Sequence, residues 1–252
     1  MDKIIHLVID YYREPRLVEE QDKTKFYLQK YAYLNKKRED YYNDMQEEFA
    51  KMIKSINKYK GFYIGRYETG DNVSHYSTFK YPKIVRYNSN ISYVTWYNAY
   101  IDLERLSGKT EKYVKTGIIY DSLREYTLKW LNETDTRSYH EISGDSGSWG
   151  NYQDNDKTVT SGGTTPARTG AIQTITYKAE IYNDSPTSSN NIFDIAGNVY
   201  EWTMAWDNDG VRRVSGGAFP GTGLYYPASS TFRYEPNTIQ SQLGVRGELL
   251  IK

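Results

Sequence analysis

The distribution of glycine divides this 252-residue chain into two parts. All 19 glycines lie from Gly61 onward, and the residues before it are rich in Lys, Glu, Gln and Tyr and predict helix. After Gly61, short apolar runs alternate with long stretches of Gly, Ser, Thr, Asn and Asp, which is typical of short strands joined by loops. We therefore predict a helical N-terminal appendage over residues 1–58 and an α+β domain over residues 59–252.

The appendage is predicted to contain a helix from about Glu39 to Lys58, ended by Gly61. Apolar side chains recur there at helical spacing and form one stripe: Tyr42, Met45, Phe49, Met52, Ile53 and Ile56. A second helix is predicted from Leu17 to Leu34. No catalytic pattern occurs in this part, so we expect it to serve packing or oligomerisation.

The second part is predicted to place helices among short strands. Thr95 is the expected N-cap of a helix that ends at Gly108, and Ser122 with Glu125 forms the expected capping box of another. The predicted strands are Gly61–Glu68, Arg212–Phe219, Thr231–Tyr234 and Val245–Ile251. The tryptophans expected in the core are Trp96, Trp130 and Trp202.

Composition excludes several classes of protein. The 27 tyrosines can build a core while their hydroxyls stay hydrated, so disorder is not expected. A net charge of zero argues against a nucleic-acid partner. No apolar run is long enough to span a membrane, and the N-terminus lacks the pattern of a signal peptide. Without cysteine, the chain has no disulfide, thiolate metal site or thiol chemistry.

The segment Phe193–Thr203 (FDIAGNVYEWT) contains the most specific pattern. The carboxylates of Asp194 and Glu201 flank a Gly-Asn turn, and oxygen ligands gathered on one tight loop suit Ca²⁺. Acidic residues beside a turn are also often merely solvated, so the spacing alone leaves both interpretations open.

With four other motifs in order, this segment resembles the formylglycine-generating-enzyme family, a branch of the C-type-lectin-like fold. The five motifs are GFYIGRYE at Gly61–Glu68, VTWYNA at Val94–Ala99, DIAGNVYEW at Asp194–Trp202, RVSGGAF at Arg213–Phe219 and GVR at Gly244–Arg246. The resemblance covers residues 58–252. The departures from the family pattern are conservative for packing: Tyr200 for Trp, Ser215 for Arg, Ala218 for Ser and Val245 for Phe. The resemblance implies a C-type-lectin-like domain of the formylglycine-generating-enzyme type.

The same resemblance implies that the chain is not an enzyme. Catalytic members bind copper through two cysteines, whose matching positions here are about Gly221 and Tyr226. Related sulfoxide synthases hold iron with three histidines, and the histidines here lack metal-ligand spacing: His6, His75 and His140. We therefore expect neither copper nor iron and no catalytic residue. The family's structural calcium loop does carry over, with side-chain ligands from Asp194 and Glu201 and carbonyl ligands from Gly197 and Val199.

Non-catalytic members with this fold resemble the variable proteins of diversity-generating retroelements. In these proteins the stretch matching Pro220–Leu243 is diversified and binds ligand. Its candidate contact residues are types common in antibody paratopes: Tyr225, Tyr226, Ser229, Ser230, Tyr234 and Asn237. Adenine-directed mutation cannot create Glu or Gln from Asn-type codons, so three positions are expected to stay fixed: Glu235, Gln240 and Gln242. Tyrosine is abundant throughout the chain, so a plain surface loop is the alternative.

The resulting expectation is a non-enzymatic protein that binds a ligand or receptor on a C-type-lectin-like scaffold. We expect a retroelement-diversified phage or surface protein, displayed on a virion or outside the cell, whose macromolecular ligand is a host-surface protein or a glycan. The helical appendage is expected to support any oligomer. The alternatives are a fixed structural virion protein and, less favoured, a metalloenzyme of the formylglycine-generating type.

Overall fold

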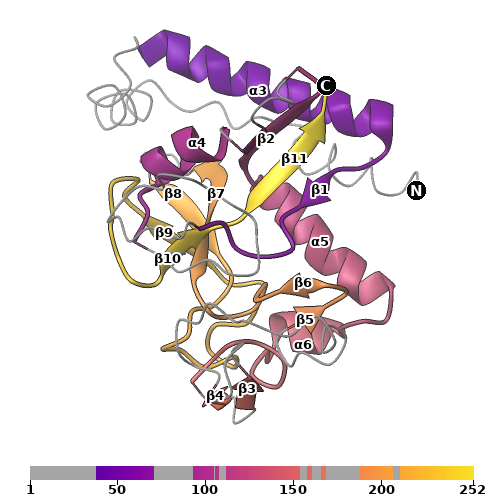
Figure 1. The fold of residues 1–252 in the computed structure, drawn as a ribbon, viewed down its shortest axis with the longest axis vertical. Coiled ribbons are helices and arrows are strands. Elements are labelled where there is room, and N and C mark those ends of the chain that lie inside the picture. Colours follow the sequence, from indigo (N-terminus) through magenta and orange to yellow (C-terminus); the bar gives the residue numbers. More distant parts are fainter. Residues whose placement is uncertain are drawn as a thin grey trace.

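The computed structural model describes residues 38–70, 93–104, 106–107, 112–153, 158–160, 166–168, 188–206 and 211–252. Helices and short strands are mixed along this part of the chain, which confirms the α+β class (Figure 1). The helices are α3 (Arg38–Tyr59), α4 (Trp96–Glu104), α5 (Asp121–Glu133) and α6 (Tyr139–Ser143). The predicted helix over Leu17–Leu34, together with His6 and His75, lies outside the described residues.

The strands form two main sheets. The strands of the first sheet are β1 (Tyr63–Ile64), β11 (Gly247–Ile251) and β2 (Val114–Ile118), in that order and antiparallel. Those of the second are β10 (Leu243–Val245), β7 (Tyr200–Trp206), β8 (Arg212–Ser215) and β9 (Thr231–Tyr234). In the second sheet β10 runs parallel to β7, and the other neighbours are antiparallel. Two small ladders pair β3 (Thr158–Thr160) with β4 (Pro166–Arg168) and β5 (Ser188–Ser189) with β6 (Ile192–Phe193).

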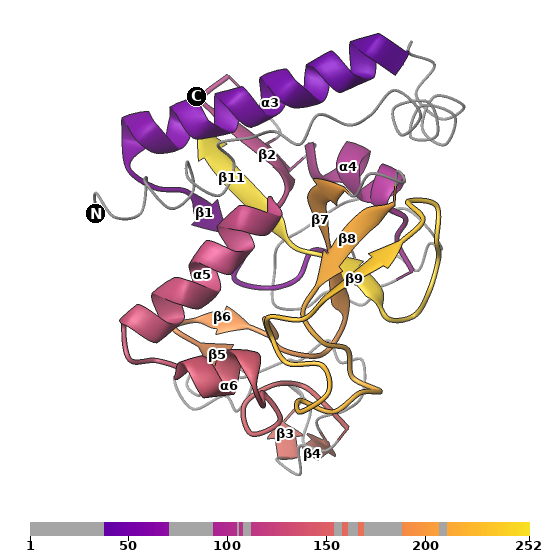
Figure 2. The ribbon, with the colours of Figure 1, turned by 180° about the vertical axis from the view of Figure 1, so that it is seen from behind.

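Helix α3 confirms the helix predicted from the apolar stripe, and it lies across one end of the molecule beside β2 and β11 (Figures 1 and 2). Met52 and Ile56 are buried in the same hydrophobic cluster as Trp202. The Ser55 hydroxyl donates to the carbonyl oxygen of Ile251 at 2.6 Å. The second half of α3 is therefore part of the core that the strands build. No helix in the described ranges is long and apolar enough to cross a membrane.

Two of the three predicted core tryptophans are confirmed. Trp96 and Trp202 are fully buried. Their indole N–H groups donate at 2.9 Å to the carbonyl oxygens of Thr203 and Val94, so α4 and β7 hold each other in place. Trp130 is wrong as a core residue, because it lies on the outer side of α5 with 37% of its surface exposed. Trp149, which was not among the predicted core residues, is buried.

The N-caps predicted from the sequence are confirmed for one helix and wrong for another. Thr95 caps α4 as predicted, since its hydroxyl accepts the Asn98 N–H at 3.1 Å. The capping box at Ser122 is wrong: α5 begins at Asp121, and its N-cap residue, Tyr120, makes no side-chain cap. The Tyr120 N–H instead donates to the distant Glu248 carboxyl at 3.2 Å. A capping box does form at α6, between Ser138 and Glu141.

The predicted strands are shorter or interrupted, with one exception. Only Tyr63–Ile64 of the Gly61–Glu68 stretch pairs as a strand, and β8 ends at Ser215 because Gly216 turns the chain at φ 85°. The stretch Val245–Ile251 is divided between β10 and β11 at Arg246. Strand β9 has the predicted bounds.

Candidate functional site

A buried ionic cluster lies where the sequence motifs meet. Both oxygens of Glu201, at the start of β7, accept hydrogen bonds from arginines: Oε2 from Arg124 Nε at 3.1 Å and Oε1 from Arg246 Nε at 2.7 Å. All three side chains are at most 2% exposed. Charges removed from water in this way are tolerated because each is paired and every guanidinium nitrogen donates a hydrogen bond. Burial lowers the pKa of Arg246, but the nearby carboxylates of Glu201 and Glu68 raise it overall.

The remaining guanidinium nitrogens bind backbone carbonyl groups from separate segments. Arg246 donates to Gly65 at 2.9 Å and to Phe193 at 2.8 Å. Arg124 donates to Ile195 at 2.7 Å and to Ala228 at 2.9 Å. The cluster therefore joins the residues after β1, the turn before β7 and the loop before β9. Sequence reasoning missed Arg124, although an arginine between apolar residues of the helix predicted to begin at Ser122 was a usable signal.

The turn before β7 has a strained backbone held by Asn198. Asp194, Gly197 and Asn198 all adopt positive φ angles. A Cβ on Gly197 would lie 2.2 Å from the carbonyl oxygen of Asn151, so only glycine fits there. The Asn198 side chain donates to the buried Glu68 and accepts from the Asn151 amide at 3.3 Å. Burial, with the neighbouring Asp194 carboxylate, raises the pKa of Glu68 well above its usual value.

The predicted calcium ligands differ in how well they fit a cation. Glu201 does not fit, because both of its oxygens already accept from arginines and its charge is compensated. Asp194 is buried in the same turn as Gly197 and Val199. Among the described residues, no group of three His, Cys, Asp or Glu side chains is arranged to hold a metal. Calcium at Asp194, with the carbonyls of Gly197 and Val199, stays a prediction.

The loop between β8 and β9 carries the most exposed apolar side chains of the predicted ligand-binding stretch. Leu224 is 58% exposed and Tyr225 is 75% exposed. Their backbone is fixed on both sides, because the Tyr226 N–H donates to the Thr222 carbonyl at 3.0 Å and the Tyr152 hydroxyl donates to the Tyr226 carbonyl at 2.6 Å. We call Thr222–Tyr226 the tip loop.

The tip loop also contacts the segment after α6 through backbone atoms. The Ser146 N–H donates to the carbonyl oxygen of Gly223 at 3.1 Å. A Cβ placed on Gly223 would lie 1.9 Å from the backbone nitrogen of Gly147, so the two chains touch at a point that admits no side chain. Nearby, the Ala228 N–H donates to the Ser146 hydroxyl at 2.9 Å.

The six predicted contact residues are not equally available. Tyr225, Ser229 and Asn237 are exposed, whereas Ser230 is half-buried. Tyr226 and Tyr234 do not project as expected. They pack edge-on against Phe232 and Trp202, with ring centroids 5.6 and 6.3 Å apart. Burial also raises the pKa of the Tyr234 hydroxyl. Sequence reasoning missed the exposed Leu224 and Ile239, which stand out as apolar residues within Gly-, Pro- and Ser-rich loops.

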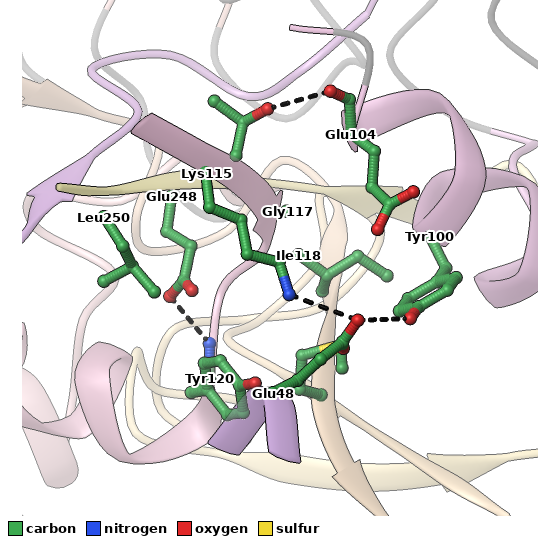
Figure 3. A pocket seen from close by; sticks show the side chains of 11 residues that line it. Glu48, Tyr100, Glu104, Lys115, Gly117, Ile118, Tyr120, Glu248 and Leu250 are labelled. Atoms are coloured by element: carbon green, nitrogen blue, oxygen red, sulfur yellow. Dashed lines mark hydrogen bonds and ion pairs between the residues drawn. The ribbon is translucent and has the colours of Figure 1, made fainter. Parts of the chain in front are cut away.

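A separate cavity lies between α3, α4 and the first sheet, and Figure 3 shows its polar lining. Glu48 accepts from the Tyr100 hydroxyl at 2.8 Å and pairs with Lys115 at 3.1 Å. Burial raises the pKa of the nearby Glu248 to about 8. The cavity measures about 20 Å³, which is room for a single water molecule and not for an organic ligand.

Comparisons with known proteins give structural likenesses and no sequence match. No protein-family model and no curated protein matches the chain. The chain is similar to Treponema denticola variable protein 1, with TM-score 0.44 and 15% identity over 74% of this chain and 84% of that one. It is also similar to CarF, with TM-score 0.44 and 15% identity over 66% and 69% of the two chains. PvdO from Pseudomonas aeruginosa gives a TM-score of 0.42 and 16% identity over 75% and 80%.

Proposed function

We propose that this chain is a non-enzymatic binding protein whose tip loop contacts a macromolecular ligand. The observation that carries the proposal is the pair Leu224 and Tyr225, exposed on a backbone that hydrogen bonds hold at both ends. A rigid loop loses little conformational entropy on binding, and exposed tyrosine contributes large contact area with few rotatable bonds. Tyrosine is also enriched among the residues that dominate binding energy.

The sequence around the tip loop favours a ligand recognised without charge. No Asp, Glu, Lys, Arg or His occurs from Ser215 to Phe232, although a quarter of the whole chain is charged. The exposed Ser229 and Asn237 offer neutral hydrogen-bonding groups on the same predicted stretch. Contact through apolar and neutral polar groups suits a host-surface protein or a glycan, and we expect the affinity to depend weakly on salt.

More specifically, we propose that the chain contains a C-type-lectin-like domain of the formylglycine-generating-enzyme type. This domain would be diversified by a retroelement and displayed on a virion or cell surface. It rests on the five ordered motifs, whose residues Glu201 and Arg246 meet in the buried cluster. The fold can tolerate diversification at Leu224 and Tyr225, because both side chains are exposed and a change there leaves the buried cluster untouched.

The test is the gene's neighbourhood and its variation between isolates. A reverse-transcriptase gene and a near-copy of the 3′ coding stretch are expected beside this gene. Codon changes between isolates are expected at adenines within Pro220–Leu243, with Glu235, Gln240 and Gln242 unchanged. A gene without either neighbour, and with an invariant stretch, would favour a fixed structural protein instead.

A further inference from the structure

Six exposed lysines in the part of the chain that the structure describes lie at one end of the molecule. These residues lie on the second half of α3, just after it, just before β2 and just after β11, and together we call them the lysine surface: Lys51, Lys54, Lys58, Lys60, Lys112 and Lys252. Since the whole chain has a net charge of zero, this surface is a local concentration of positive charge and not the result of an overall excess.

The segments that carry the lysine surface lie side by side. Lys51, Lys54 and Lys58 follow one another at helical spacing, so they lie on the same exposed side of α3. The Tyr59 hydroxyl donates to the carbonyl oxygen of Lys252 at 2.7 Å, and the Lys252 N–H donates to the carbonyl oxygen of Tyr113 at 2.8 Å. These bonds bring the end of α3, the end of β11 and the start of β2 together, as Figure 2 shows.

Three lysines of this surface lack a carboxylate partner among the described residues. No Asp or Glu occurs from Phe49 to Tyr67. Lys54, Lys58 and Lys60 make no ion pair with any carboxylate of the described ranges. Lys51 pairs with Glu47 at 3.3 Å, but both side chains are mostly exposed and such pairs contribute little.

Exposed tyrosines lie among these lysines. Tyr63 and Tyr113 are each 61% exposed. The ammonium groups of Lys58 and Lys112 lie 4.6 Å from the ring centroids of Tyr59 and Tyr113. Tyrosine is enriched where proteins meet the lipid headgroup layer, because its ring is apolar and its hydroxyl is polar.

We propose that the lysine surface binds an anionic lipid bilayer at its headgroups. Lysine is a point charge on a flexible stem, which suits a fluid layer of phosphates, whereas nucleic-acid recognition favours the planar fork of arginine. The tip loop contacts the segment after α6, at the end of the molecule away from α3 (Figure 1). A chain bound in this way would turn its tip loop away from the bilayer, but the proposal does not depend on the tip loop binding anything.

The test is co-sedimentation of the full chain with phosphatidylcholine vesicles, with and without phosphatidylglycerol. Binding is expected only to the anionic vesicles and is expected to weaken with added salt. The triple variant Lys54→Gln/Lys58→Gln/Lys60→Gln should bind about a hundredfold more weakly, since each lysine near an anionic surface contributes roughly fivefold. Lys129→Gln on α5 is the control and should bind like wild type. The double variant Tyr63→Ser/Tyr113→Ser should lose the binding that remains at high salt.

Circular dichroism melts of each variant establish that it is folded before vesicles are added. The proposal is overturned if the wild-type chain ignores anionic vesicles at low salt, or if the folded triple variant binds them as wild type does. Competition by duplex DNA at equal phosphate concentration provides the last comparison. If the protein binds duplex DNA more tightly than the anionic vesicles at equal phosphate concentration, the partner is a nucleic acid and the lipid assignment is wrong.

Discussion

Arg124 donates a hydrogen bond from Nη1 to the carbonyl oxygen of Ala228 at 2.9 Å while its Nε binds the Glu201 carboxylate. One side chain therefore ties the buried ionic cluster to the loop that follows the tip loop. The position of the candidate binding residues therefore depends on a cluster that is itself buried.

Replacing the central carboxylate should be costly for this reason. Glu201→Gln leaves two buried guanidinium groups without their counter-charge, and breaking a buried pair typically costs about 3–5 kcal/mol of unfolding free energy. Urea unfolding of the variant measures the loss. Glu133→Gln, which removes the partner of Lys129 in an exposed pair, is the control and should change stability by less than about 1 kcal/mol. An equally small loss for Glu201→Gln would contradict the proposed importance of the cluster.

Adjacent tyrosines in the tip loop should respond differently to truncation. Tyr225→Ala removes an exposed side chain and should change the unfolding free energy by no more than about 0.5 kcal/mol. Tyr226→Ala removes a ring packed on Phe232 and should cost about 1–3 kcal/mol. Thermal and urea unfolding of the two variants provide the comparison. If Tyr225→Ala proves the more destabilising change, Tyr225 is a packing residue and the proposed contact lies elsewhere.

The titration of Glu248 should lower the free energy of unfolding as pH rises from about 4.5 to about 8. Burial raises its pKa from the usual 4.5 to about 8, so the folded state retains a proton that the unfolded chain has already released. The contribution is complete below about pH 4.5 and is lost as pH rises to about 8, at up to about 1.4 kcal/mol per pH unit.

Glu248→Gln keeps an oxygen for the Tyr120 N–H and removes the titration. Denaturant midpoints of wild type and variant at pH 5 and 8 test the linkage. Relative to wild type, the variant should have a higher denaturant midpoint at pH 8 than it has at pH 5. A difference that stays constant would mean that Glu248 is ionised in the folded protein. The raised pKa of Glu68 affects both proteins equally, so it does not enter the comparison.

Calcium should stabilise the wild-type chain if the turn at Asp194 binds it. A cation held only by the folded state raises the melting temperature by mass action. Added Ca²⁺ is expected to raise the melting temperature of wild type, a chelator to lower it, and Asp194→Asn to remove both responses. A wild-type protein that melts identically under all conditions would mean that the turn is held by hydrogen bonds alone.

The sequence predicted features that depend on neighbouring residues. The apolar stripe of α3, the Thr95 cap and the burial of Trp96 and Trp202 all follow from periodicity or from one local hydrogen bond. The features it missed depend on distant partners. Ser122 is not a cap because the start of α5 is held by Glu248, 128 residues away.

In the candidate site, too, the sequence predicted the local features and missed those that depend on distant partners. Motif order indicated which segments would meet, and it indicated a turn at Gly197. It did not reveal that the Glu201 carboxylate binds two arginines, because Arg124 comes from a helix outside all five motifs. Nor could composition separate the exposed Tyr225 from Tyr226, whose burial depends on Phe232 in the next strand.

The contact between Gly223 and Gly147 matters for protein engineering. Since a side chain at Gly223 would collide with the opposite backbone, this position is closed to substitution, while its neighbours Leu224 and Tyr225 are open to solvent. A synthetic library could therefore randomise residues 224 and 225 while the glycine pins the loop in one conformation. Each clone would then differ in the chemistry at the tip and not in the shape of the support beneath it.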